Sequence, residues 1–258
     1  RPELHFSLRP HAGQAKSAAN MFAALKGSEI VASHFEGDNR VQDAYSLRCA
    51  PQVSGAVRDS IAYAKSVAEN ELASAIDNPV VLESGEVTSN GNFHGAPVGY
   101  VLDFLAITAT DLGSISERRT DNMLDKARSF GLPPFLAGDA GVDSGMMIGQ
   151  YTAAGLVSEN KRLAVPASVD SIPTSAMQED HVSMGWHAAR KLRRVVDNLR
   201  MILAIEWVSA GRALDSRAPL KPAKVTGEWL AKLRTRVAGV GPDRFLAPEL
   251  QAAVELLR

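Results

Sequence analysis

Apolar residues recur at three- and four-residue steps along three long stretches of this chain. The first begins near Pro51 and ends near Ala75, and the last runs from about His181 to Leu214. The apolar stripe of the last stretch is Leu192, Val195, Val196, Leu199, Ile202 and Leu203. This period predicts amphipathic helices. Because thirty-odd residues at about 1.5 Å each span roughly 50 Å, the last helix exceeds a typical globular helix and favours a bundle.

The segments between these stretches contain residues that end helices. A residue before proline is pushed out of the helical region, so Asp77-Asn78-Pro79 ends the first helix. Val80–Leu82 and Glu86–Thr88 flank Ser84-Gly85, which predicts a short β-hairpin. The middle helix is expected from about Pro97 to Arg128. We therefore predict an all-α fold, a bundle of long helices with one short β-hairpin.

The rest of the chain predicts shorter helices and no division into separate domains. No fixed repeat or long linker interrupts the 258 residues. A single helical-bundle region is expected, with a mixed segment at about 1–50, the long central helices at 51–215 and short helices at 216–258. The mixed segment contains a small Ala-rich stretch near 18–25, and the shorter helices are predicted at about 146–163, 226–237 and 248–257.

Charge and cysteine content narrow the classes of function. Lys and Arg number 28 against 29 Asp and Glu, a net charge of −1, which argues against nucleic acid or an anionic membrane as the partner. No apolar run reaches the length of about 20 residues that a membrane span needs. Cys49 is the only cysteine, so no intrachain disulfide can form and a cytoplasmic location is expected. His181 and His187 are six residues apart, which does not suit a helical metal site.

The first polar cluster that suggests chemistry contains Gln42, Tyr45 and Arg48. These residues are spaced by three, so one helical or 3₁₀ turn would place them on one face. Arginine binds a carboxylate through two parallel hydrogen bonds, and the phenol and amide can donate around it. The cluster therefore suits an amino acid ligand. A solvated helix start is the alternative from spacing alone.

Two further clusters each precede a predicted long helix. Residues 89–97 combine glycines, asparagines, Phe93 and His94, and the positive end of the next helix could face a ligand there. Residues 175–181 contain Glu179, a carboxylate that could meet a cationic or imidazole substrate. Simple helix caps are the alternative for both clusters, Asn for the first and Asp180 or Ser183 for the second.

Glu206 lies within an apolar run of the last predicted helix, Met201–Val208. A carboxylate in apolar surroundings is costly unless it is paired and hydrogen-bonded. We therefore expect Glu206 to have a structural role, either paired with an arginine or capping a polar network at a contact between helices.

Five strings in this order resemble one family: VQDAYSLRCAPQVSGA at 41–56, AIDNPVV at 75–81, SNGNFHGAPV at 89–98, SERRTDNMLD at 116–125 and QEDHVSMG at 178–185. The set resembles the histidine ammonia-lyase family, within the aromatic amino acid ammonia-lyases. The resemblance extends over essentially the whole chain. Because the set is long and ordered, it is far more specific than any single short motif.

The resemblance implies a mainly helical subunit whose long helices pack into the central bundle of a homotetramer. Such enzymes remove ammonia from L-histidine to give trans-urocanate. Their electrophile is 4-methylidene-imidazole-5-one, formed from an internal Ala-Ser-Gly without a metal. An electron sink of this kind is needed because the β-proton of histidine is not acidic and an amine leaves poorly.

The resemblance also assigns roles in the segment at about 1–50, which would bind substrate. Arg48 would bind the substrate carboxylate, and Tyr45 would orient the substrate beside the electrophile. Gln42 would support the pocket of the electrophile. The Arg48 and Tyr45 roles are catalytic in this family, while Gln42 belongs to the binding pocket.

Four further residues take their roles from the resemblance. Asn78 would hydrogen-bond near the carboxylate or the electrophile, and Phe93 would shape the pocket wall. Glu179 would face the imidazole or the amine, with Gln178 beside it as a binding residue. Relatives that act on phenylalanine or tyrosine usually carry Gln at the position of Glu179. A carboxylate can accept a hydrogen bond from an imidazole N–H, but beside a bare phenyl ring it would lack a partner, which costs free energy. Glu179 therefore favours histidine as the substrate.

The chain departs from the family in one respect. Ser-Gly occurs at Ser54, Ser84 and Ser144, but none of these pairs follows alanine, so the chain contains no Ala-Ser-Gly. It therefore resembles only the C-terminal half of the family, and we expect it to be inactive without the N-terminal half. The alternatives are a phenylalanine or tyrosine ammonia-lyase or aminomutase, and a non-catalytic helical assembly fragment.

Overall fold

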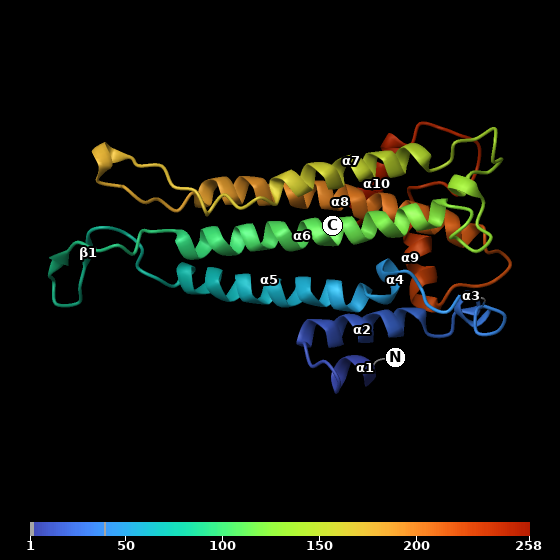
Figure 1. Ribbon diagram of the computed structural model, residues 1–258, viewed down its shortest axis with the longest axis horizontal. Helices are drawn as coiled ribbons and strands as arrows, with labels where there is room; N and C mark the ends of the chain where they lie inside the picture. The colour runs from blue at the N-terminus through green and yellow to red at the C-terminus, as the bar shows by residue number, and fades with distance from the viewer. Residues whose placement is uncertain (1–2, 39) are drawn as a thin grey trace.

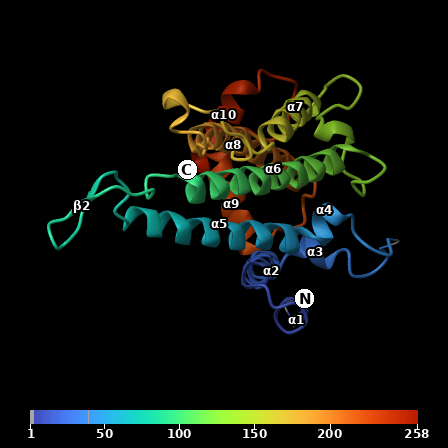
Figure 2. The ribbon, with the colours of Figure 1, turned by 60° about the vertical axis from the view of Figure 1, so that its left-hand side comes forward.

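Three long helices lie side by side through the centre of the structure (Figure 1). They are α5 (Ala50–Leu72), α6 (Ala96–Leu124) and α8 (Gly185–Asp215). In this computed structural model, which describes residues 3–38 and 40–258, α6 packs between α5 and α8. Helix α7 (Met147–Leu163) packs against α6 and α8, and α2 (Ala12–Leu25) covers the other side of α5 (Figure 2).

Shorter elements complete the bundle. The hairpin is formed by β1 (Val80–Val81) and β2 (Val87–Thr88), which pair antiparallel with Val80 opposite Thr88. The short helices are α1 (Glu3–Phe6), α3 (Glu29–Ala32), α4 (Tyr45–Arg48), α9 (Lys224–Arg234) and α10 (Ala247–Leu256), with 3₁₀ turns η1 (Pro134–Leu136) and η2 (Ser175–Met177). The predicted helical bundle with one hairpin is confirmed.

The largest differences from the predicted helix ends, in α6 and α8, have reasons in the local backbone. Helix α6 ends at Leu124 instead of near Arg128, because Asp125 is extended and its carboxylate accepts the Ala127 N–H at 2.8 Å. Helix α8 begins at Gly185, because Met184 adopts a left-handed conformation with φ 50°. Neither Asp180 nor Ser183 occupies the N-cap position of α8.

The largest cluster of buried apolar side chains lies where α8 meets α7, α9 and α10. It includes Met146, Ile205, Val208 and Leu233, each essentially inaccessible to solvent. Burial of such a side chain stabilises the fold by about 1.5–3 kcal/mol. A smaller cluster of Ala106, Ala109 and Val195 fills the contact between α6 and α8, where small side chains let the two helices approach closely.

Glu206 is paired with an arginine between helices, as expected. Its carboxylate accepts from Arg119 Nη2 at 2.8 Å and from Ser116 Oγ at 2.5 Å, both on α6. Arg119 Nη1 also donates to the Ser46 carbonyl at 3.4 Å. The carboxylate on α8 therefore holds α6 and, through Arg119, the short helix α4.

Helix α6 has the length and composition of a membrane span, with a mean hydropathy of 1.3 over its most apolar window. The core helix of a bundle meets the same criterion. In this structure α6 packs against α5 on one side and α8 on the other.

Two helical glycines offer a matched test of packing between α2 and α5. A Cβ on Gly55 would lie 2.4 Å from the Gln14 Cα and backbone N, whereas a Cβ on Gly155 in α7 would meet nothing within 4 Å. Backbone atoms cannot move aside as side chains can, so we expect Gly55→Ala to lower the free energy of unfolding by about 1–3 kcal/mol. Gly155→Ala should raise it by about 0.5–1 kcal/mol, because alanine favours the helix. Urea unfolding followed by circular dichroism measures both, and a loss of equal size in both variants would contradict the close contact.

Candidate functional site

The predicted site residues form two groups at opposite ends of α5. The Arg48 group precedes the helix and consists of Gln42, Tyr45 and Arg48. The Glu179 group lies beyond the other end and consists of Asn78, Phe93, Gln178 and Glu179. Helix α5 has 23 residues, so its ends are about 34 Å apart. In Figure 1, α4 lies near the start of α5, whereas the hairpin and the loop that carries η2 extend from the opposite end.

The members of the Arg48 group contact one another. Arg48 Nη1 donates to Gln42 Oε1, and the guanidinium carbon lies 4.7 Å from the centre of the Tyr45 ring. Gln42 precedes α4, so only Tyr45 and Arg48 share the predicted helical turn. All three side chains are exposed, with Tyr45 at 70%. The group is therefore assembled and open to a ligand.

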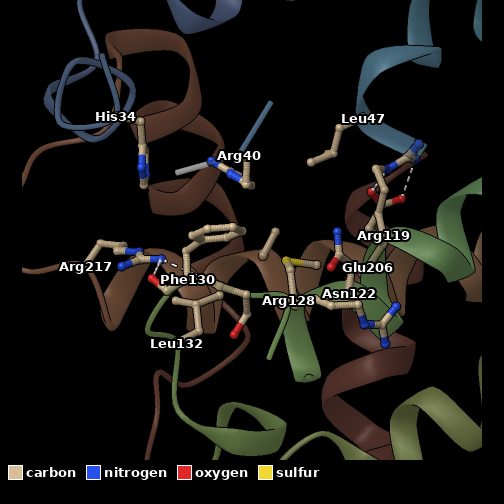
Figure 3. A pocket seen from close by; sticks show the side chains of 13 residues that line it. His34, Arg40, Leu47, Arg119, Asn122, Arg128, Phe130, Leu132, Glu206 and Arg217 are labelled. Atoms are coloured by element: carbon tan, nitrogen blue, oxygen red, sulfur yellow. Dashed lines mark hydrogen bonds and ion pairs between the residues drawn. The ribbon is translucent and has the colours of Figure 1, made fainter. Parts of the chain in front are cut away.

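A cavity of about 270 Å³ lies beside α4 (Figure 3). Several arginines line it, but each already has a protein partner. Arg119 binds Glu206, Arg217 donates to the Phe130 carbonyl at 2.7 Å, and Arg40 lies 3.6 Å over the Phe130 ring. The hydrogen bonds from Arg40 lower the pKa of Asp38 to about 2. The Arg48 group does not line this cavity, whose charged lining residues are engaged with other protein groups.

Asn78 organises the loop that carries Phe93. Its Oδ1 accepts from Ser89 Oγ at 3.0 Å and from the Asn90 N–H at 2.9 Å. Asn90 Nδ2 in turn donates to the Asp77 carbonyl at 2.9 Å. Because the oxygen of Asn78 is engaged, its amide nitrogen is the atom left to donate to a carboxylate. The asparagines do not cap α6, whose N-cap residue is Gly95.

Glu179 stands at the end of a tight and strained turn. The Thr174 N–H donates to the Glu179 carbonyl at 3.0 Å, and Thr174 Oγ1 donates to the Glu179 carboxylate. Between them, Ser175, Ala176 and Met177 all have positive φ, from 49° to 72°, which is unfavourable for side chains with a Cβ. Hydrogen bonds from the Thr174 and Ser175 hydroxyls lower the pKa of Glu179, so its carboxylate is ionised at neutral pH.

Two histidines that were not predicted as site residues join the loops of the Glu179 group. The His94 and His181 rings are parallel within 3°, with centroids 5.6 Å apart, and His94 Nε2 lies 3.2 Å from the His181 carbonyl oxygen. Each histidine is one or two residues from a predicted site residue, Phe93 or Glu179. The sequence shows that each histidine lies near a predicted site residue, but it does not show that the two rings contact each other.

A buried ion pair anchors the base of the Glu179 loop. Asp103 on α6 accepts from Lys191 Nζ at 2.6 Å and from the Ser168 N–H at 2.7 Å. Lys191 also donates to the Val165 carbonyl. Burial raises the pKa of the Asp103 carboxyl, but the hydrogen bonds from Lys191 and Ser168 outweigh this effect and hold the pKa below its ordinary value.

No group of three or more potential metal ligands occurs within residues 3–38 and 40–258.

Residues 1–235 match the model of the aromatic amino acid lyase family. The chain belongs to this family. It is 67% identical over all 258 residues to a histidine ammonia-lyase of Streptomyces avermitilis. Among solved structures, a histidine ammonia-lyase of Trypanosoma cruzi aligns with the whole chain at a TM-score of 0.90 and 41% identity. A tyrosine aminomutase of Streptomyces globisporus aligns over the whole chain at a TM-score of 0.90 and 38% identity.

This aromatic amino acid lyase chain spans about half the length of the curated relatives it matches. It covers 50% of the Streptomyces avermitilis enzyme, 48% of the Trypanosoma cruzi chain and 52% of the aminomutase chain. The matching part is the C-terminal half.

The Asp103 ion pair generates a prediction about acid stability. Because the pKa of Asp103 is lower in the folded chain than in the unfolded chain, its contribution is full at neutral pH and is lost as the pH falls through the folded-state pKa. Asp103→Asn should lower the free energy of unfolding by about 2 kcal/mol at neutral pH, and the difference from wild type should shrink in acid. Urea midpoints measured from neutral pH down to about pH 3 test this. Asp111→Asn, at an exposed position of α6, is the control, and a difference that stayed constant with pH would be the contrary result.

Proposed function

We propose that this chain is the C-terminal half of a cytoplasmic histidine ammonia-lyase, which eliminates ammonia from L-histidine to give trans-urocanate. The observation that carries the proposal is the ionised Glu179 carboxylate, held in its loop by Thr174. The 67% identity to the Streptomyces avermitilis enzyme over the whole chain supports the same assignment.

The Arg48 group would hold the amino acid end of the substrate. Arg48 already donates one N–H to Gln42, and its stacking on Tyr45 restricts the plane of the guanidinium. A carboxylate can accept two parallel hydrogen bonds from such a fork, which fixes its orientation as well as its position. Gln42 and Tyr45 therefore preorganise Arg48, and the Tyr45 hydroxyl is free to face the reacting carbons.

The Glu179 group would hold the ring end of the substrate. An ionised carboxylate accepts an imidazole N–H or pairs with an imidazolium, and it has no favourable partner in a phenyl ring. Phe93, which is 56% exposed, would form an apolar wall beside it, with Gln178 as a further binding residue.

The electrophile would come from the other half of the enzyme. The three Ser-Gly pairs of this chain follow Val53, Glu83 and Asp143, so the chain has no Ala-Ser-Gly from which to form 4-methylidene-imidazole-5-one. The residues present thus do not provide this group. In the complete enzyme it would supply the electron sink that the elimination requires.

The separation of the two groups requires more than one chain in each site. Histidine is far shorter than the roughly 34 Å between the ends of α5, so one substrate cannot reach Arg48 and Glu179 of the same chain. A homotetramer that places opposite ends of different chains together would complete the site. Exposed apolar residues on α6, Tyr100, Phe104 and Ile107, offer a surface for such packing.

Glu179→Gln tests the choice of substrate. The complete enzyme for this purpose is the present chain joined to the N-terminal half of the Streptomyces avermitilis relative. We expect kcat/KM for histidine to fall about 100-fold, equivalent to about 2.7 kcal/mol of transition-state stabilisation, because the neutral amide is a weaker acceptor. Urocanate formation measures it, and Asp180→Asn is the neighbouring control. A wild-type enzyme that preferred phenylalanine or tyrosine would overturn the proposal and favour a lyase or aminomutase for those substrates.

Arg48→Lys tests the carboxylate contact in the same enzyme. Lysine keeps the charge but presents a point donor in place of a fork, so we expect KM for histidine to rise about tenfold. Steady-state kinetics measure the change, with Arg200→Lys, at an exposed ion pair of α8, as the control. Kinetics equal to wild type would exclude the role given to Arg48.

A further inference from the structure

The contact between His94 and His181 has no part in the roles described so far. It joins two loops that are far apart in the sequence, one carrying Phe93 and the other Glu179. The other side of His94 borders a cavity of about 520 Å³ that Glu71, Asn92 and Pro97 also line. The His94 ring therefore has the His181 loop as a hydrogen-bonding and stacking partner and also borders an open space.

The hydrogen bond determines which nitrogen of His94 carries the proton. A carbonyl oxygen can only accept, so His94 Nε2 donates to His181 O and must be protonated. The parallel rings add stacking to this bond. Together they fix both the direction and the distance of the His181 backbone relative to His94.

Glycines let the backbones at the starts of α6 and α8 approach each other closely beside this contact. A Cβ on Gly99 would lie 3.4 Å from the Gly185 Cα and the Ser183 carbonyl oxygen, and one on Gly95 would lie 3.4 Å from Ser183 Oγ. The first turns of α6 and α8 therefore touch through glycines. The histidine contact lies just outside this junction, where the two loops begin.

Glu179 belongs to the same loop and follows, after one intervening residue, three residues in the left-handed region. Such a backbone persists only when surrounding contacts hold it in place. The Thr174 bridge holds one side of the turn, and His181, two residues after Glu179, lies on the other side.

We propose that His94 is a positioning residue that sets the place of Glu179 relative to Phe93, through its hydrogen bond to the His181 carbonyl and its stacking on the His181 ring. The inference rests on the proposed function, because it gives His94 a role in selecting an imidazole substrate. His94 touches no reacting atom, and its effect passes through Glu179.

A double-mutant cycle in the complete enzyme tests this path. His94→Phe keeps the ring but removes the donor, and the adjoining cavity leaves room for the larger side chain. We expect KM for histidine to rise about tenfold with kcat changed less than about threefold, and the preference for histidine over phenylalanine to fall. In the Glu179→Gln background the same substitution should change kcat/KM less than about twofold.

His94→Gln is the conservative variant, because its amide N–H can still donate to the His181 carbonyl. It should restore most of the preference for histidine. His187→Phe, at an exposed position of α8, is the matched control and should behave as wild type. If His94→Phe lowered kcat/KM equally in the enzyme with Glu179 and in the Glu179→Gln enzyme, the proposal would be overturned. A merely structural loss would act equally in both backgrounds.

Hydrogen exchange gives a readout that needs no substrate. The Thr174 and Glu179 N–H groups donate to each other's carbonyls, and we expect both to exchange about tenfold faster in His94→Phe. Unchanged exchange would overturn the positioning role. The two proposals remain distinguishable, because absence of histidine turnover by the wild-type enzyme overturns the function, whereas normal turnover with unchanged loop exchange overturns only the role of His94.

Discussion

The close packing of α6 along α8 is the contact on which both groups of predicted site residues depend. At one end, Gly99 meets Gly185 and brings the Phe93 and Glu179 loops together. In the middle, Ala106, Ala109 and Val195 exclude solvent. Towards the other end, Glu206 on α8 binds Arg119 on α6, which reaches the Ser46 carbonyl in α4. The α6–α8 pair thus places the Glu179 loop at one of its ends and α4, which carries Arg48, towards the other.

Two carboxylates between α6 and α8, those of Asp103 and Glu206, are tolerated because each has several partners. Asp103 has an ammonium and a backbone N–H, and Glu206 has a guanidinium and a hydroxyl. An isolated charge in such a position would cost several kcal/mol, and removal of one partner would restore that cost. These ion pairs and hydrogen bonds connect helices that are distant in the chain, so they also favour one alignment of α6 against α8 over others.

The sequence predicts what depends on local spacing. Periodicity predicts the long helices, the need for a partner predicts that Glu206 binds an arginine, and three-residue spacing predicts that Tyr45 and Arg48 share a turn. The four-residue helices α1, α3 and α4 are too short to show a period. Spacing also does not reveal that α5 separates Arg48 from Glu179, or that His94 meets a ring 87 residues further along the chain. Both are properties of tertiary packing.

The length of α5 has a consequence for how the family can vary. A helix is rigid along its axis, so one inserted residue would advance everything beyond it by about 1.5 Å and turn it by about 100°. The Arg48 group and the Glu179 group would then change their separation and their relative orientation. A substitution in α5 leaves this spacing unchanged, whereas an insertion or deletion in the helix requires a compensating change elsewhere. The hairpin, by contrast, can gain or lose residues at its tip without moving either group.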